Sequence, residues 1–144
     1  MTTRRKKESR TILFTAKGVT APEGFSAGGV YAGIKAKRVL DLGMVVSECE
    51  CSAAAMVTTN AVRAACVEWT KGRVGERTTR ACICNSGNAN ACTGEQGEVD
   101  TRMMAQMAAE CIGCDTDSVL VASTGIIGHF LPLEKIHTAL PSLH

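Results

Sequence analysis

Aromatic side chains are scarce in this chain, and their scarcity narrows the functions that it can have. They make up 3% of the 144 residues, whereas proteins that bind single-stranded nucleic acids stack bases on such rings. The net charge of +2 is also small, and the basic residues behind it cluster in the first ten positions. The composition therefore predicts a protein without a nucleic-acid partner.

The sequence also lacks a long hydrophobic run. Its longest uncharged stretch, residues 118–133, contains Ser123, Thr124, His129 and Pro132, so it is too short and too polar to cross a membrane. Hydrophobic residues at 45% and charged residues at 21% are typical of a globular protein. No internal repeat or second domain boundary is visible. We expect a disordered basic tail over residues 1–10 and a single domain over residues 11–144.

Turn residues and hydrophobic periodicity predict a mixed α/β fold. Strands are expected at residues 11–15, 39–47, 53–58, 81–84 and 118–123, with residues 48–51 either separating two strands or extending one. Helices are expected at residues 97–113, ended by Gly113, and at 133–140, with Pro132 in the first turn and Pro141 at the end. In the first helix, the residues expected to face the core are Val99, Met103, Met107 and Cys111. Earlier in the chain, Gly28 and Gly29 indicate a turn.

Eight cysteines allow three interpretations. Cys82 with Cys84, and Cys49 with Cys51, have the two-residue spacing of one strand face, which predicts that both pairs turn toward a core as small hydrophobic residues. Only Cys111 and Cys114 have the gap of a zinc site, and no second such pair follows. Because no secretory signal is recognisable, reduced thiols in the cytoplasm without a bound metal are favoured over zinc or disulfides.

Two segments could carry chemistry. Ser123–Gly125 ends a predicted strand, where the Thr124 hydroxyl and the backbone N–H groups around Gly125 could form an oxyanion hole. Composition alone favours an ordinary structural turn there. The loop of residues 85–94 contains Asn85, Asn88 and Asn90, which could bind a polar ligand. Such side chains more often form hydrogen bonds with their own backbone.

These same segments resemble motifs of a known family. Residues 85–94, with the sequence NSGNANACTG, resemble the signature loop of ornithine acetyltransferase, the bifunctional glutamate N-acetyltransferase of arginine biosynthesis. Residues 123–128, STGIIG, followed by Leu131 and Pro132, resemble its second motif. Residues 32–35, AGIK, and 58–60, TTN, follow the order of that family, so the resemblance covers roughly residues 18–136.

The resemblance implies a fold and a reaction. The fold is the α-chain part of an N-terminal-nucleophile fold. The family's precursor cuts itself before an internal threonine, which then begins a β chain and is the nucleophile. That threonine takes an acetyl group from N-acetylornithine and passes it to glutamate, and many members also accept acetyl-CoA. Thr124 and Gly125 match the family's oxyanion pair. No cofactor is implied, and the expected partner is the β chain, in an α2β2 heterotetramer.

The sequence also departs from the family pattern. It contains no Ala-Thr dipeptide, which is the family's cleavage point, and it lacks the Thr-Thr-Asp and Lys-Gly-Ser-Gly segments that precede the cut. We therefore expect an incomplete α chain, with the nucleophile and most substrate-binding residues elsewhere. The alternative is a non-catalytic remnant or interaction module that keeps the family fold.

Overall fold

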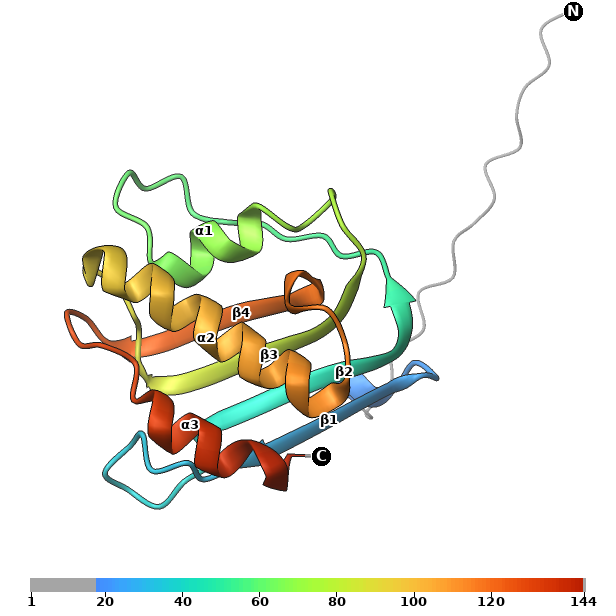
Figure 1. The fold of residues 1–144 in the computed structure, drawn as a ribbon, viewed down its shortest axis with the longest axis horizontal. Coiled ribbons are helices and arrows are strands. Elements are labelled where there is room, and N and C mark those ends of the chain that lie inside the picture. The colour runs from blue at the N-terminus through green and yellow to red at the C-terminus, as the bar shows by residue number, and fades with distance from the viewer. Residues whose placement is uncertain (1–17, 144) are drawn as a thin grey trace, which may run out of the picture.

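A four-stranded sheet forms the centre of the computed structural model, which describes residues 18–143. The strands are β1 (Phe25–Val30), β2 (Leu42–Cys51), β3 (Thr79–Asn88) and β4 (Val119–Ile126), in the order β1-β2-β3-β4 (Figure 1). The first three are antiparallel, and β4 lies parallel to β3 at the edge. The predicted tail over residues 1–10 and the predicted strand over 11–15 lie outside the described residues.

Helices lie over one face of this sheet in Figure 1. They are α1 (Ala65–Lys71), α2 (Gly94–Ile112) and α3 (Leu133–Ala139), with short 3-10 turns at Gly18–Thr20, Thr116–Ser118 and Leu140–Ser142. A parallel strand pair needs a long crossover, and α2 provides it between β3 and β4. The predicted mixed α/β class is confirmed. Among the described residues, no helix is both long and apolar enough to span a membrane.

The core between the sheet and the helices is aliphatic, as the shortage of aromatic residues predicts. Alternate strand residues face the helices and are buried: Leu42, Met44, Ala81, Ile83, Val119 and Val121. Helix α2 contributes Met104, Ala105, Ala108 and Ala109, which are also buried. Because three of these four side chains are alanine, α2 packs close to the sheet.

Side chains of α1 secure the edge strand β4. The Trp69 indole N–H donates to the Val119 carbonyl at 2.9 Å, and the Thr70 hydroxyl donates to the Val121 carbonyl at 2.8 Å. The Arg73 guanidinium lies 3.2 Å from the centre of the Trp69 ring and 2.6 Å from an Asp117 carboxylate oxygen. The hydrogen bond from Arg73 holds the pKa of Asp117 below its usual value. These contacts secure the first half of β4, the strand that carries Thr124 and Gly125 near its end.

The structure decides one open alternative and corrects two predictions. Strand β2 begins at Leu42 and continues to Cys51, so residues 48–51 extend it, which was one of the two alternatives. The strand expected at residues 53–58 is wrong, because this segment has no regular structure and no neighbouring strand to pair with, and Met56 is fully exposed. The turn expected at Gly28 and Gly29 is also wrong. Both lie in β1, where a side chain at Gly28 would meet the Leu143 carbonyl at 3.2 Å.

Helix α2 confirms its predicted end but not its predicted core stripe. Gly113 ends the helix in the left-handed conformation with φ of 72°. Val99 and Met103 are 53% and 37% exposed, so they do not face the core as expected, while Met107 is half-buried. The buried face is offset by one residue and includes Thr101 and Met104, both 0% exposed. Alanines and polar residues make up much of that face, so hydrophobicity alone points to the wrong side.

The two neighbouring methionines of α2 provide a matched stability test. We expect Met104→Ala to lower the free energy of unfolding by about 2–5 kcal/mol, because it leaves a cavity in the core. Met103→Ala should change it by less than about 0.5 kcal/mol, because that side chain is partly in solvent. Urea unfolding of the two variants measures both values. Equal losses would contradict the orientation of α2 described here.

Candidate active site

The parallel strands β3 and β4 end together, and their backbones touch there. Thr124 lies beside Ser86, and Gly125 lies beside Gly87. The pairing shifts between Gly87 and Asn88, where β3 forms a bulge. Gly125 has φ of 136°, and a Cβ on it would lie 2.2 Å from the Gly87 carbonyl carbon and 2.4 Å from the Asn88 nitrogen. Only glycine fits this position. The prediction that β3 stops at Asn85 is wrong, since the strand continues to Asn88.

The three asparagines hold this strand end in place. Asn85, Asn88 and Asn90 are 3%, 6% and 0% exposed. Asn85 Nδ2 donates to the Asn88 carbonyl at 2.9 Å, and Asn88 Nδ2 donates to the Phe130 carbonyl at 2.7 Å. Asn88 Oδ1 accepts a hydrogen bond from the Asn90 backbone N–H at 2.8 Å. These amides replace ladder hydrogen bonds where the strand leaves the sheet.

Asn90 ties the loop to the start of α2. Its backbone is left-handed, with φ of 46°, and its Nδ2 donates at 2.8 Å to both the Gly97 carbonyl and the Thr101 hydroxyl. The Thr93 hydroxyl donates to Asn90 Oδ1 at 2.9 Å. A Cβ on Gly97 would lie 2.0 Å from the Thr93 hydroxyl oxygen, so glycine is needed there too. The geometry supports the structural alternative for Asn90, in which the side chain binds its own chain.

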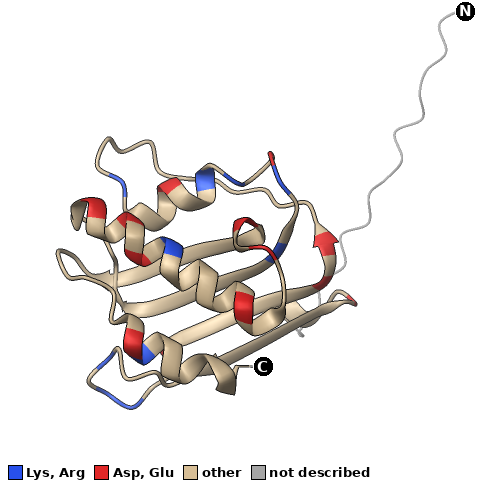
Figure 2. Cartoon of the chain, viewed as in Figure 1, with Lys and Arg blue, Asp and Glu red and all other residues tan. Residues whose placement is uncertain are grey.

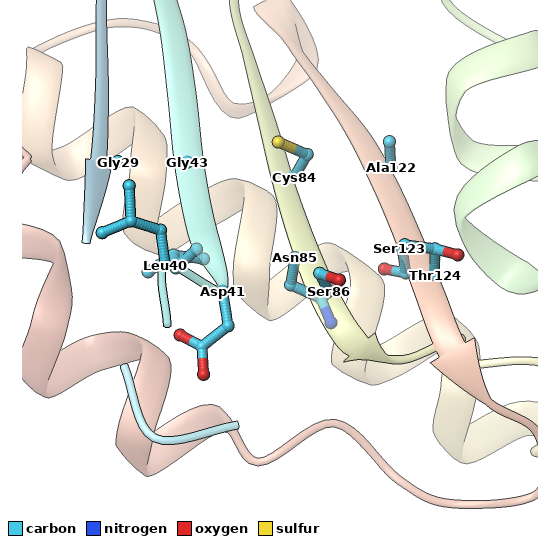
Figure 3. Close-up of a pocket in the computed structure, with 11 residues that line it drawn as sticks. Gly29, Leu40, Asp41, Gly43, Cys84, Asn85, Ser86, Ala122, Ser123 and Thr124 are labelled. Atoms are coloured by element: carbon cyan, nitrogen blue, oxygen red, sulfur yellow. The ribbon is translucent and has the colours of Figure 1, made fainter. Parts of the chain in front are cut away.

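Ligand binding by the asparagines stays a prediction, and Asn85 has the best geometry for it. Among the described residues its Oδ1 is buried without a hydrogen-bond partner. Asn85 also lines a hollow of about 340 Å³ with Gly43, Cys84, Ala122 and Thr124 (Figure 3). An unpaired acceptor beside a cavity is a place where a ligand or water would gain a hydrogen bond.

Thr124 lies between two hollows. It lines the hollow of Figure 3 and also a larger groove of about 750 Å³, whose wall includes Gly125, Lys35 and Lys37. Thr124 is exposed, and its hydroxyl forms no hydrogen bond within residues 18–143. The sequence singled out Thr124 and Gly125, and the structure puts both at an accessible strand end. Sequence reasoning missed the two lysines, whose only signal was a short basic segment after an apolar one.

The prediction that the Cys-x-Cys pairs turn toward the core is wrong for the described residues. Cys84 is exposed and Cys82 is half-buried, because Ala81 and Ile83 occupy the positions of β3 that face the helices. Burial, together with the neighbouring Cys84, raises the pKa of the Cys82 thiol. Cys49 is exposed, and the Cys51 thiol donates to the Thr79 carbonyl at 3.1 Å.

None of the eight cysteines, all of which lie within the described residues, is paired in a disulfide. Cys111 and Cys114, the pair with a zinc-like gap, are both partly buried. Within residues 18–143, no three His, Cys, Asp or Glu side chains gather closely enough to hold a metal ion. The absence of a bound metal stays a prediction.

Comparison with known proteins identifies the family. Residues 26–144 match the ArgJ family. The chain belongs to the ArgJ family. The ArgJ protein of a Synechococcus strain, named arginine biosynthesis bifunctional protein ArgJ, is 46% identical over 125 residues. That match covers 86% of this chain and 30% of the relative, so the chain spans about a third of the length of the curated ArgJ proteins it matches.

Solved structures of the ArgJ family agree with this assignment. The ArgJ protein of Bacillus halodurans superposes with a TM-score of 0.78 and 42% identity, over 83% of this chain and 62% of that one. The ornithine acetyltransferase of Mycobacterium tuberculosis, solved in complex with ornithine, gives a TM-score of 0.83 and 44% identity, over 88% of this chain and 68% of that one. The resemblance to ornithine acetyltransferases, and the fold that it implies, are confirmed.

The asparagine network makes a testable prediction about stability. We expect Asn90→Ala to lower the free energy of unfolding by about 1–3 kcal/mol, because it leaves buried polar groups without partners. Asn60→Ala is the matched control, since Asn60 is exposed and bonds only within its own turn. Thermal unfolding of both variants makes the comparison. A loss for Asn60→Ala as large as for Asn90→Ala would show that the network adds no stability.

Proposed function

We propose that this chain forms the oxyanion hole of an enzyme that transfers an acetyl group from N-acetylornithine to glutamate, with acetyl-CoA as a second donor. The Thr124 hydroxyl and the Gly125 N–H are the two donors. Membership of the ArgJ family supports this proposal. So do the names of its relatives, which are arginine biosynthesis bifunctional proteins, one of them an ornithine acetyltransferase in complex with ornithine.

The observation that carries the proposal is the contact between Gly125 and the β3 bulge. The backbone of Gly125 has no room to shift toward Gly87 and Asn88, while Thr124 beside it is exposed. Donors that are fixed before the reaction stabilise a developing negative charge without having to reorient. Bulges commonly lie next to active sites because they redirect a side chain or end a strand pairing.

The proposed reaction uses this hole twice. The nucleophilic threonine attacks the acetyl carbonyl carbon, the carbonyl electron pair moves to oxygen, and the amine of that threonine accepts its hydroxyl proton. Collapse of the oxyanion breaks the bond to nitrogen, and ornithine leaves with the proton. The glutamate amine then attacks the acetyl-threonine ester, which forms a second oxyanion at Thr124 and Gly125. Its collapse releases N-acetylglutamate and restores the threonine hydroxyl.

The proposal places the nucleophile on a β chain, which arises by self-cleavage of a longer precursor. Support comes from the sheet face opposite the helices, which we term the open face. It carries uncharged residues, among them Val45, Cys82, Leu120 and Ala122, and Figure 2 shows few charged positions along the strands. An uncharged sheet face is stabilised when a second layer covers it. We propose that the rest of a cytoplasmic α2β2 heterotetramer provides this layer.

Replacing Thr124 tests the proposal. The enzyme for this test, termed the grafted enzyme, is the Mycobacterium tuberculosis ornithine acetyltransferase with its matching segment replaced by residues 18–143. We expect Thr124→Ala to lower kcat about 100- to 1,000-fold, as for the loss of one oxyanion-hole donor. The KM should change less, because the hydroxyl stabilises charge that exists only in the tetrahedral state. Steady-state transfer from N-acetylornithine to glutamate measures both constants.

Thr124→Ser is the matched control, because it keeps the hydroxyl and should retain most of the activity. Self-cleavage passes through a similar oxyanion, so processing of each variant is first scored on a denaturing gel. A fully processed Thr124→Ala enzyme that turns over at the parent rate would remove the side chain from the proposed hole. Only the backbone N–H groups around Gly125 would then be left as donors.

The isolated chain should not transfer acetyl groups, because the proposal places the attacking threonine elsewhere. We expect residues 1–144 alone to form no N-acetylglutamate from N-acetylornithine and glutamate, measured by mass spectrometry. Turnover by the purified chain, with a Thr124→Ala sample as control for contaminating enzyme, would contradict this placement. A grafted enzyme that is folded and processed but inactive would favour the non-catalytic interaction module instead.

A further inference from the structure

A basic loop borders the candidate oxyanion hole. It joins β1 to β2, and its residues Lys35 and Lys37 line the groove of about 750 Å³ that also contains Thr124 and Gly125. We term this cavity the lysine groove. Figure 1 shows the loop at the same end of the sheet as the ends of β3 and β4, and Figure 2 shows its basic residues in blue. Apolar side chains of Ile34 and Ile126 form other parts of the wall.

Hydrogen bonds hold this loop in a fixed shape. Asp41 is only 3% exposed, and its carboxylate accepts from the Ala32 backbone N–H at 2.6 Å and from the Lys35 backbone N–H at 2.8 Å. The loop also packs on β3, since a Cβ on Gly87 would lie 3.0 Å from both Ile34 Cγ2 and Lys35 Cγ. Gly87 is the residue that touches Gly125. The aliphatic part of Lys35 therefore lies next to the backbone that shapes the oxyanion hole.

The positive charges of Lys35 and Lys37 are not neutralised by other residues that line the groove. Among the described residues, no acidic side chain lines the lysine groove, and the two carboxylate oxygens of Asp41 accept hydrogen bonds from backbone N–H groups. Within residues 18–143, neither Lys35 nor Lys37 forms an ion pair. A concave site with two ammonium groups and no carboxylate attracts anions.

We infer that Lys35 and Lys37 bind the side-chain carboxylate of the acceptor amino acid and so select glutamate. This inference rests on the proposed function. Glutamate carries a side-chain carboxylate, which the two lysines attract. Glutamine has the same length without the charge, so it lacks this attraction. An acceptor held by its side chain beside Gly87 has its amine within reach of an acetyl group at Thr124 and Gly125.

The short distance between the lysines and the oxyanion pair favours a small acceptor over the phosphates of acetyl-CoA. A long arm separates those phosphates from the thioester. Lys35, in contrast, packs against Gly87, which is the neighbour of Gly125 on the adjacent strand. Phosphate binding is the competing outcome, and the experiment below separates the two anions by their substrates.

The test uses the grafted enzyme with Lys35→Gln and Lys37→Gln combined. Glutamine keeps a polar side chain of similar shape and removes the charge. We expect the KM for glutamate to rise about tenfold, as for loss of charge-assisted hydrogen bonds. The preference for glutamate over glutamine as acceptor should fall by a similar factor, which a purely structural role would not cause. Lys71→Gln, at an exposed position on α1, is the control and should change neither value.

Two further measurements decide between the outcomes. Release of ornithine from N-acetylornithine without any acceptor should be unchanged, because this half-reaction does not involve glutamate. If the unsubstituted grafted enzyme releases no ornithine, the proposed function fails. If ornithine is released but the KM for glutamate does not move in the double variant, the lysine inference alone is overturned. A higher KM for acetyl-CoA with an unchanged KM for glutamate overturns it as well, in favour of phosphate binding.

Binding can also be measured without turnover. Residues 1–144, labelled with nitrogen-15, are titrated with glutarate, a dicarboxylate that lacks the reactive amine. We expect saturable shifts of the Gly87 and Gly125 amide signals that weaken in the double variant and at high salt. Shifts of equal size in the double variant would overturn the inference.

Discussion

Backbone contact between β4 and the β3 bulge is the constraint on which the candidate site depends. Gly125 lies so close to Gly87 and Asn88 that any side chain would displace one strand from the other. The asparagines hold the bulge from the α2 side, and the basic loop packs on Gly87 from the groove side. Trp69 and Thr70 secure β4 along its outer edge. Two separate parts of the chain thus fix this strand end, and α1 secures the beginning of β4.

Buried asparagine side chains stabilise the end of a strand that leaves its sheet. A strand that leaves its sheet gives up ladder hydrogen bonds, and buried backbone groups without partners cost free energy. Asn88 provides both a donor and an acceptor, so it serves Phe130 and Asn90 together. Asn90 continues the network to Gly97 at the start of α2. The loop that resembles the family's signature motif therefore also supports the strand end that carries Thr124.

Local patterns in the sequence predict where helices and strands lie better than they predict which face of each element is buried. Gly113 as a helix end and the strand before Thr124 follow from local chemistry, and the motifs around Asn85 and Thr124 identify the family. Tertiary packing decides which face of α2 is buried. It also decides whether Cys82 and Cys84 face the helices or the opposite side of the sheet. The position of Lys35 beside Gly87 could not be predicted for the same reason, because only the fold brings the two residues together. Hydrophobicity likewise misplaced a strand at residues 53–58, which lacks a pairing partner.

The most direct measurement of the central claim is a crystal structure of the grafted enzyme with a boronic acid. Boron forms a tetrahedral adduct with the nucleophilic threonine and places an oxygen where the oxyanion would be. The account predicts that this oxygen lies about 2.7–3.1 Å from both the Thr124 hydroxyl oxygen and the Gly125 nitrogen. An adduct whose oxygens contact neither atom would contradict the assignment of the oxyanion hole to this strand end.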